Sequence, residues 1–358
     1  MPANRKRPWI LVLSSLCMTC ALALSPQKTS GFSVEPWCRT KIDYSAANEY
    51  IEAHYGMGRV GVGESRHYFG AASKEEPVLD ARYGVLDDFS ETKKAATMES
   101  TGFTLVHAPT KTTEWSNVSH VRATYLPELE HIIRDNFKGS MISHVIFFNP
   151  MLRGEDLLPS RPDDSSISPS SSIALSTHID ADIGAYPDIE GVVNLIEKNR
   201  IDTGLFPRDE LNQALKKGGR FAIVNAWRNI GSFPIERYPL ALFATRYTGS
   251  KAFPDGVLDF LRSRWYTFPN MEQDELLLFR QYDRDVSHPS DLWHCALNVV
   301  GDANAPPRQS FDVRCFIVFD EDVPADRDRF GADRMRSLYS QKDSETFNSE
   351  QAKRRHQG

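Results

Sequence analysis

Short strand-like runs separated by turn-forming residues fill most of the chain after residue 220, and they restrict the possible fold more than any other feature. The runs are rich in β-branched and aromatic residues, which fit the pleated surface of a sheet. Six such runs cover residues 221–227, 240–247, 264–268, 275–282, 292–299 and 310–319. Earlier apolar stretches at 102–109, 143–149 and 173–177 bring the expected total to about nine strands.

Helical patterns occur mainly before this β-rich part. Residues 125–137 carry apolar side chains at helical spacing, residues 188–218 have a largely helical pattern, and residues 43–55 suit a short helix. Many short strands accompanied by few helices favour packed or closed sheets. The sequence therefore predicts a mainly β fold with flanking helices, built on a double-stranded β-helix (jelly-roll, cupin-like) core.

The first 25 residues have the composition of a signal peptide or another targeting segment. Basic residues at positions 5–7 precede an apolar run from Trp9 to Leu24, which is about 16 residues long. Because a helix that spans a bilayer needs about 20 apolar residues, an uncleaved membrane anchor is the less favoured alternative. We expect the chain to enter the secretory pathway or an organelle reached through it.

Composition divides the remaining chain into an N-terminal extension (26–74), a core domain (75–320) and a polar C-terminal tail (321–358). The net charge of −6 argues against a general nucleic-acid-binding protein, because phosphate binding needs a basic face. The five cysteines show neither a disulfide framework nor a zinc-binding spacing. Residues 160–172 are rich in Ser, Pro and Asp, which predicts a loop and a candidate lid.

The only His-x-Asp pair in the chain, His178 and Asp180, directly follows an apolar stretch. In an extended chain residues i and i+2 point the same way, so both side chains can reach one ion. His294 lies within a strand-like run and is the favoured third ligand, whereas His288 is a competitor beside a proline in a polar turn. Two histidines and one carboxylate are the ligand set of non-haem Fe(II) oxygenases, although a buried hydrogen-bonded histidine is the ordinary explanation for His294 alone.

A second co-facial pair, Arg308 and Ser310, opens the last strand-like run. A guanidinium can hold a carboxylate through two parallel charge-assisted hydrogen bonds, and a serine hydroxyl beside it adds a donor. A dicarboxylate such as 2-oxoglutarate could therefore bind iron through its oxo-acid end while Arg308 holds the other end. A lone surface arginine in a salt bridge would explain Arg308 equally well, but the ordered set of His-x-Asp, distal His and Arg-x-Ser makes that alternative less favoured.

Several segments resemble the fungal and bacterial hydroxylase/desaturase family that includes the gibberellin desaturase, the aspergillic-acid-pathway hydroxylase/desaturase and the cephamycin 7-hydroxylation component. The resemblance covers roughly residues 75–320. Its motifs occur in family order and include THIDAD (177–182), VNAWRNI (224–230), RWYTFPNMEQDELLLFRQYD (264–283), WHCALN (293–298) and PPRQSFDVRC (306–315).

The resemblance implies a double-stranded β-helix that oxidises unactivated C–H bonds with O2 and 2-oxoglutarate. It assigns His178, Asp180 and His294 to the metal and Arg308 and Ser310 to the oxo acid. Four further residues are candidate substrate contacts, with ordinary packing as the alternative: Asn225, Trp227, Arg228 and Tyr247. The sequence departs from the family pattern at Asn229, Ala244, Ser263 and Arg284, outside the metal and oxo-acid positions, so the substrate is more in doubt than the reaction type.

The function that best fits these features is an Fe(II)- and 2-oxoglutarate-dependent oxygenase that hydroxylates or desaturates a small, secondary-metabolite-like molecule. No catalytic residue is expected beyond the metal site. A cupin-like metalloenzyme that does not use 2-oxoglutarate and a secreted β-sandwich binding module are the alternatives. The predicted partners are O2 and a small-molecule substrate, without nucleic acid, and the oligomeric state stays open.

Overall fold

The computed structural model describes most of the compact unit that spans Glu35–Gly358. The described residues are 35–47, 73–86, 92–137, 139–157, 167, 169–180, 183, 186, 188–202, 204–244, 264–299 and 304–330.

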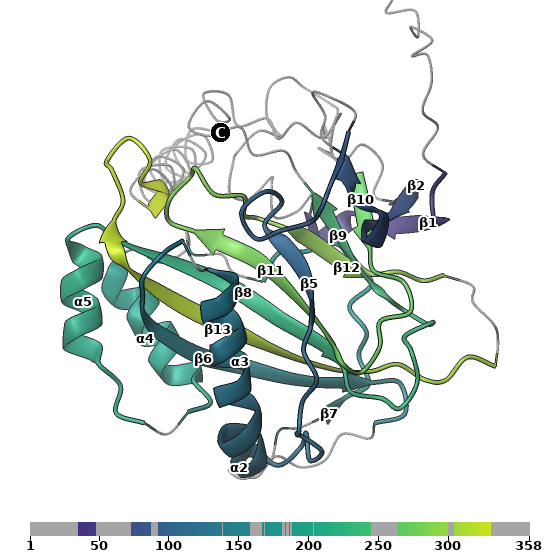
Figure 1. Ribbon diagram of the computed structural model, residues 1–358, viewed down its shortest axis with the longest axis horizontal. Coiled ribbons are helices and arrows are strands. Elements are labelled where there is room, and N and C mark those ends of the chain that lie inside the picture. Colours follow the sequence, from purple (N-terminus) through teal and green to yellow (C-terminus); the bar gives the residue numbers. More distant parts are fainter. Residues whose placement is uncertain are drawn as a thin grey trace, which may run out of the picture. The chain divides into compact units, whose positions relative to one another are not determined.

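Two large β-sheets form the core of the protein (Figure 1). The five-stranded sheet has the order β1 (Cys38–Asp43), β2 (Ser73–Asp80), β10 (Arg264–Thr267), β9 (Leu240–Ala244) and β12 (Trp293–Ala296). The six-stranded sheet has the order β5 (Phe103–His107), β11 (Glu275–Asp283), β8 (Gly219–Asn229), β13 (Gln309–Asp322), β6 (Ile142–Gly154) and β7 (Pro169–Ser170). A small ribbon pairs β3 (Val85–Leu86) with β4 (Lys93–Lys94). Within the two sheets, neighbouring strands are antiparallel except β2–β10 and β6–β7.

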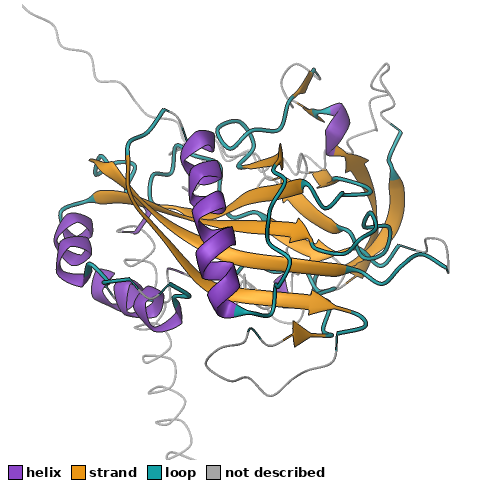
Figure 2. Cartoon of the chain, turned by 60° about the horizontal axis from the view of Figure 1, so that its bottom comes forward, coloured by secondary structure: helices purple, strands orange, loops and turns teal. Residues whose placement is uncertain are grey.

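The helices cover the six-stranded sheet (Figure 2). A continuous helical segment comprises α2 (Val118–His120), the π-helical turn η2 (Val121–Tyr125) and α3 (Leu126–Asn136), and it packs on one face of the sheet. The remaining helices are α4 (Ile189–Asn199), α5 (Arg208–Lys216) and the 3-10 turn η1 (Ala81–Tyr83). Helices α4 and α5 pack against one end of the opposite face. Asp188 caps α4 by accepting a 2.8 Å hydrogen bond from the backbone N–H of Gly191, which satisfies one of the unpaired donors at the start of the helix.

Central strand β8 is buried along its whole length, so both of its faces must be covered. Side chains alternate between the faces of a strand. Ala222, Val224 and Ala226 pack toward the α2–α3 segment, whereas Phe221 and Ile223 pack toward α4 and α5. Beyond Ile223 the second face is no longer apolar, and this polar end of the sheet is where the candidate site lies.

The mainly β prediction is confirmed, and eight of the predicted runs coincide with β5, β6 and β8–β13. The stretch 173–177 is wrong as a strand, because Ser176 takes part only in an isolated bridge to Asp43. The helical region 188–218 is divided, since Pro207 precedes the second helix. Of the predicted helix 43–55, only residues 45–47 are helical within the described part.

Strands β1 and β2 were not predicted from the sequence. Their sequences, CRTKID and SKEEPVLD, are charged and partly exposed, so they lack the apolar alternation of a half-buried strand. Strand β1 pairs along its full length with β2, which in turn pairs in parallel with β10. A part of the predicted N-terminal extension therefore belongs to the five-stranded sheet.

The described part of the C-terminal tail, residues 321–330, contacts the core through some of its residues, while others are exposed. Strand β13 extends to Asp322, and Arg284 holds Asp328 through two hydrogen bonds of 2.8 Å. Phe330 is buried against the core. The targeting segment 1–25 lies outside the described residues, and it stays a prediction together with the domain boundaries. Within the described ranges, no helix is long and apolar enough to span a membrane.

A buried ion pair between β8 and β11 yields a prediction about stability. Arg220 donates two hydrogen bonds to Asp283, of 3.1 and 2.8 Å, and the Asp283 side chain is fully buried. We expect Asp283→Ala to lower the free energy of unfolding by about 3–5 kcal/mol, because it removes the fully buried carboxylate shared by Arg220 and Arg280 and leaves Arg220 only the partly exposed Glu321. Chemical denaturation would measure this change.

The control is Glu130→Ala on α3, which removes an exposed pair with Arg134 and should cost less than about 1 kcal/mol. Equal losses in the two variants would contradict the expected importance of the buried pair.

Candidate metal centre

The centre depends on a backbone pairing between the segment that carries His178 and strand β12. The N–H of His178 donates to the carbonyl of His294 at 3.1 Å, and the N–H of His294 donates to the carbonyl of His178 at 2.9 Å. Residues that exchange both hydrogen bonds in an antiparallel pair present their side chains on the same face. The two imidazole rings accordingly lie side by side, with their centroids 4.3 Å apart.

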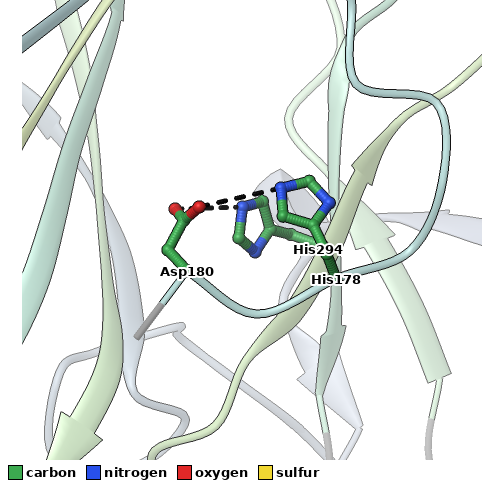
Figure 3. A group of neighbouring side chains, drawn as sticks. All are labelled: His178, Asp180 and His294. Atoms are coloured by element: carbon green, nitrogen blue, oxygen red, sulfur yellow. Dashed lines mark ion pairs between the residues drawn. The ribbon is translucent and has the colours of Figure 1, made fainter. Parts of the chain in front are cut away.

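Asp180 completes the group from two positions further along the chain (Figure 3). One carboxylate oxygen lies 3.7 Å from Nε2 of His178, and the other lies 3.4 Å from Nε2 of His294. One donor atom from each of the three residues falls within 4.8 Å of the others. Among the residues that the structure describes, no other set of three or more His, Cys, Asp or Glu side chains converges in this way.

Both histidines are held with Nε2 toward the centre of the group. Nδ1 of His178 lies 2.7 Å from the carbonyl of Ser176, and Nδ1 of His294 lies 3.1 Å from the carbonyl of Leu292. Such outer hydrogen bonds fix the ring and its tautomer in metal sites. Burial, followed by the proximity of His294, lowers the pKa of His178 to about 4. A neutral imidazole near pH 7 is the form that binds a cation.

Asp180 is oriented by residues of the six-stranded sheet. Arg314 donates a 2.8 Å hydrogen bond to one carboxylate oxygen, and the side-chain amide of Asn225 donates to the other. Asn225 and Arg314 are direct cross-strand partners on β8 and β13. Burial disfavours the charged carboxylate, but the proximity and hydrogen bond of His294, together with the charge of Arg314, hold the pKa of Asp180 well below its usual range. The carboxylate is therefore ionised, as a metal ligand must be.

Gln281 connects the two ligand-bearing segments. Its side-chain oxygen accepts a 2.7 Å hydrogen bond from the N–H of Asp180, and its side-chain nitrogen donates to the carbonyl of Leu292 at 2.9 Å. The same carbonyl of Leu292 is the hydrogen-bond partner of Nδ1 of His294. One fully buried glutamine thus fixes the aspartate and the second histidine relative to each other.

Two imidazole nitrogens and one carboxylate oxygen on one side of a possible ion form the ligand set that non-haem Fe(II) oxygenases use. The structure brings together the three predicted ligands. It places the competitor His288 elsewhere, with Nδ1 3.2 Å from a carboxylate oxygen of Glu99. The donor set fits a divalent iron ion and leaves room for further ligands, because only three protein groups converge.

A pocket between the two sheets opens beside this group. Its walls come from β6, β8, β9, β11, β12 and β13 and from the segment before His178, and the lining residues are Arg153, Ala174, His178, Asp180, Trp227, Leu240, Phe279, His294, Ala296, Arg308 and Asp312. The side chains therefore combine an apolar wall with two guanidinium groups and one further carboxyl group.

Arg308 lines this pocket, and its guanidinium contacts Ser310. Nε and one terminal nitrogen of Arg308 donate to Oγ of Ser310 at 3.2 and 3.1 Å, and the other terminal nitrogen donates to the carbonyl of Tyr238 at 2.7 Å. The Cζ atom of the Arg308 guanidinium lies 5.1 Å from the centroid of the Trp227 ring. Burial, followed by repulsion from Arg153, lowers the pKa of Arg308 to about 10. Arg308 is thus a buried cation suited to an incoming anion.

The candidate substrate residues divide between the two faces of β8. Trp227 lines the pocket, and Asn225 on the same face contacts Asp180. Arg228 points to the opposite face, where it donates to the carbonyl of Ala108 at 2.8 Å and lies over the ring of Tyr125. The prediction that Arg228 contacts substrate is corrected by strand alternation, which places neighbouring side chains on opposite faces. Tyr247 and most of the candidate lid 160–172 lie outside the described residues.

Sequence reasoning missed four polar residues of the site: Arg153, Gln281, Asp312 and Arg314. The sequence contains a pattern that could have identified two of these residues. Asp312 and Arg314 continue the every-second-residue series that starts at Arg308 and Ser310 in an otherwise apolar strand. Charged residues at alternate positions of a buried strand share one face, and this pattern would have placed them beside the oxo-acid pair.

Comparisons with known proteins agree with this centre. The family model described as "Oxidoreductase/YMDC permease-like domain" matches residues 71–319. The "Alpha-ketoglutarate-dependent dioxygenase phiK" of a fungal species is 28% identical over 244 residues, which cover 62% of this chain and 79% of the relative. The "Hydroxylase/desaturase efuI" of Hormonema carpetanum is 25% identical over 293 residues, which cover 73% of this chain and 91% of the relative. These relatives confirm the resemblance to hydroxylases and desaturases.

A solved structure, the "iron and alpha-ketoglutarate-dependent endoperoxidase NvfI", is also similar. Its TM-score is 0.47, its sequence identity is 18%, and the match covers 79% of this chain and 98% of that one.

The position of Gln281 generates a prediction. Gln281→Leu removes both side-chain hydrogen bonds and keeps a similar volume, so we expect the affinity for a divalent metal to fall by about 10–100-fold. Titration of the metal-free protein with Fe(II) under anaerobic conditions, or with Co(II), would measure the loss.

Gln309→Leu is the matched control, because Gln309 lies on β13 and contacts Asp156 outside the pocket. An unchanged metal affinity in Gln281→Leu would show that the three ligands do not need this connection.

Proposed function

We propose that this chain, which belongs to the Oxidoreductase/YMDC permease-like family, is an Fe(II)- and 2-oxoglutarate-dependent oxygenase. The single observation that carries the proposal is the convergence of His178, Asp180 and His294 in the same pocket as a buried guanidinium, that of Arg308. Its substrate is a small organic molecule that it hydroxylates or desaturates with O2. The similarity to an alpha-ketoglutarate-dependent dioxygenase and to a hydroxylase/desaturase supports this reaction class.

The same proposal includes the architecture. Two facing sheets of mainly antiparallel strands, with the polar pocket between them, fit a double-stranded β-helix of the jelly-roll type. In this arrangement one edge of the pocket is formed by β12 and the segment of His178, and the opposite wall is formed by β8, β11 and β13.

In the mechanism, His178, Asp180 and His294 would hold Fe(II), which together with 2-oxoglutarate would supply the activation of O2 needed to oxidise a C–H bond. The protein's share is positioning and the exclusion of water. Arg308 binds the carboxylate of 2-oxoglutarate that is remote from the metal. Because Oγ of Ser310 accepts from Arg308, its own proton is free to donate to that carboxylate.

The apolar part of the pocket orients the substrate and keeps bulk water away from the metal. Trp227, Leu240 and Phe279 are buried and line the cavity. Such a site binds a hydrocarbon skeleton through apolar contacts with the pocket wall. The fit of the skeleton in the pocket then determines which carbon atom reacts.

A cupin-like metalloenzyme without 2-oxoglutarate would use the same metal ligands but would have no need for Arg308. That guanidinium is only 4% exposed, and a buried charge without an ionic partner costs free energy unless a ligand compensates it. The placement of Arg308 in the pocket therefore favours the oxo-acid-dependent reaction.

The metal assignment predicts different outcomes for two histidines of the same region. His294→Ala should abolish stoichiometric Fe(II) binding, because one of three ligands and the partner of Asp180 are lost. His288→Ala should retain iron, because its contact is to Glu99. Anaerobic Fe(II) titration and metal analysis of the purified variants would test the pair, and retention of iron by His294→Ala would refute the assignment.

The oxo-acid assignment predicts weaker cosubstrate binding in Arg308→Met. We expect the Kd for 2-oxoglutarate to rise by about 10–100-fold, since a charge-assisted hydrogen bond contributes about 1.5–3 kcal/mol, while Fe(II) binding persists. Anaerobic titration of the Fe(II)-loaded protein with 2-oxoglutarate would measure it, with Arg134→Met on the distant helix α3 as the control. Unchanged affinity would remove Arg308 from the proposed cosubstrate site.

A further inference from the structure

A second guanidinium, that of Arg153, lines the pocket and has no place in the metal or cosubstrate assignments. Arg153 lies on β6 directly opposite Ser310 in the ladder between β6 and β13. Cross-strand partners have their side chains on the same face, so Arg153 shares the inner face with the oxo-acid pair. It differs from Arg308 in being partly exposed.

The hydrogen bonds of Arg153 are few. One terminal nitrogen donates to the carbonyl of Ser172 at 2.9 Å, and the other lies 3.6 Å from the sulfur of Met151. Within the described ranges, no carboxylate forms an ion pair with it. A guanidinium has five N–H donors, and the described residues engage the two terminal nitrogens of Arg153 through only one contact each.

The charges around the pocket leave the positive charge of Arg153 without a counter-charge. Asp180 is matched by Arg314, at 2.8 Å, and the charges of Fe(II) and doubly ionised 2-oxoglutarate cancel each other. Asp312 is the remaining carboxyl group of the lining and at most balances Arg308. The loaded pocket therefore keeps at least one uncompensated positive charge.

The position of Arg153 favours the substrate, and not 2-oxoglutarate, as the ligand of its guanidinium. Arg153, Ala174, His178 and Asp180 are the partly exposed members of the lining, whereas Arg308 is buried. A molecule that enters after 2-oxoglutarate can therefore reach the guanidinium of Arg153, which is partly exposed, while Trp227 and Phe279 are buried members of the same lining.

We propose that Arg153 binds a carboxylate group of the substrate, so that the substrate class is a small organic acid with a largely apolar skeleton. This inference rests on the proposed function, because the charge balance assumes iron and 2-oxoglutarate in the pocket. Arg153 acts as a specificity-determining residue that holds the acid group while the skeleton lies along the apolar wall.

The experiment compares an acid with its neutral isostere. Full-length protein loaded with Fe(II) and 2-oxoglutarate under anaerobic conditions is titrated by calorimetry with cyclohexanecarboxylate and with cyclohexanecarboxamide. We expect the wild type to bind the carboxylate about 10-fold or more tightly than the amide. Arg153→Met should bind both equally, and Arg153→Lys should keep part of the preference because it retains the charge.

A parallel titration with 2-oxoglutarate separates the inference from the function on which it rests. In Arg153→Met the Kd for 2-oxoglutarate should stay within about 3-fold of the wild-type value, in contrast to Arg308→Met. A rise as large as that in Arg308→Met would overturn the inference and assign Arg153 to the cosubstrate. An absent acid preference in the wild type, or one that persists in Arg153→Met, would also overturn it. Failure of the wild type to bind iron or 2-oxoglutarate would refute the proposed function itself.

Discussion

The pair of backbone hydrogen bonds between His178 and His294 is the interaction on which the rest of the site depends. It fastens a segment without regular secondary structure to strand β12 and brings together histidines that are far apart in the sequence. Asp180 reaches the same place because it follows His178 by two positions. Gln281 then fixes the N–H of Asp180 and the carbonyl of Leu292. The geometry of the metal ligands is therefore set by main-chain pairing and by Gln281, and a bound cation would add to its stability.

Strand alternation divides the six-stranded sheet into a face for packing and a face for chemistry. On β13, Phe311 and Val313 pack toward the α2–α3 segment, whereas Ser310 and Asp312 face the pocket side, as does Arg308 directly before the strand. The same rule explains why Trp227 lines the pocket and Arg228 does not. A one-residue shift in register would exchange the two sets. The extensive pairing of β13 with both β6 and β8 therefore protects the site as well as the core.

The sequence predicted the strands and the ligands where local spacing carries the information. The His-x-Asp and Arg-x-Ser pairs are such cases, since residues i and i+2 of an extended chain are co-facial whatever the tertiary fold. Strands β1 and β2 escaped prediction because their charged sequences are stabilised by pairing with a distant strand, β10. Gln281 and Arg153 escaped for a similar reason: their roles arise from partners across the sheets, and no spacing within their own segments indicates those partners.

Electrostatics explains why the polar end of the pocket can exist inside a β core. Arg314 and Asp180 offset each other at 2.8 Å, and Ser310 and the carbonyl of Tyr238 occupy the donors of Arg308. These contacts satisfy hydrogen bonds, but the lining has two guanidinium groups and only one further carboxyl group, that of Asp312, so a net positive charge remains. Buried charge without a counter-charge lowers the stability of the folded protein. An anionic ligand removes this cost when it binds, so the same imbalance that weakens the empty pocket increases its selectivity for acids.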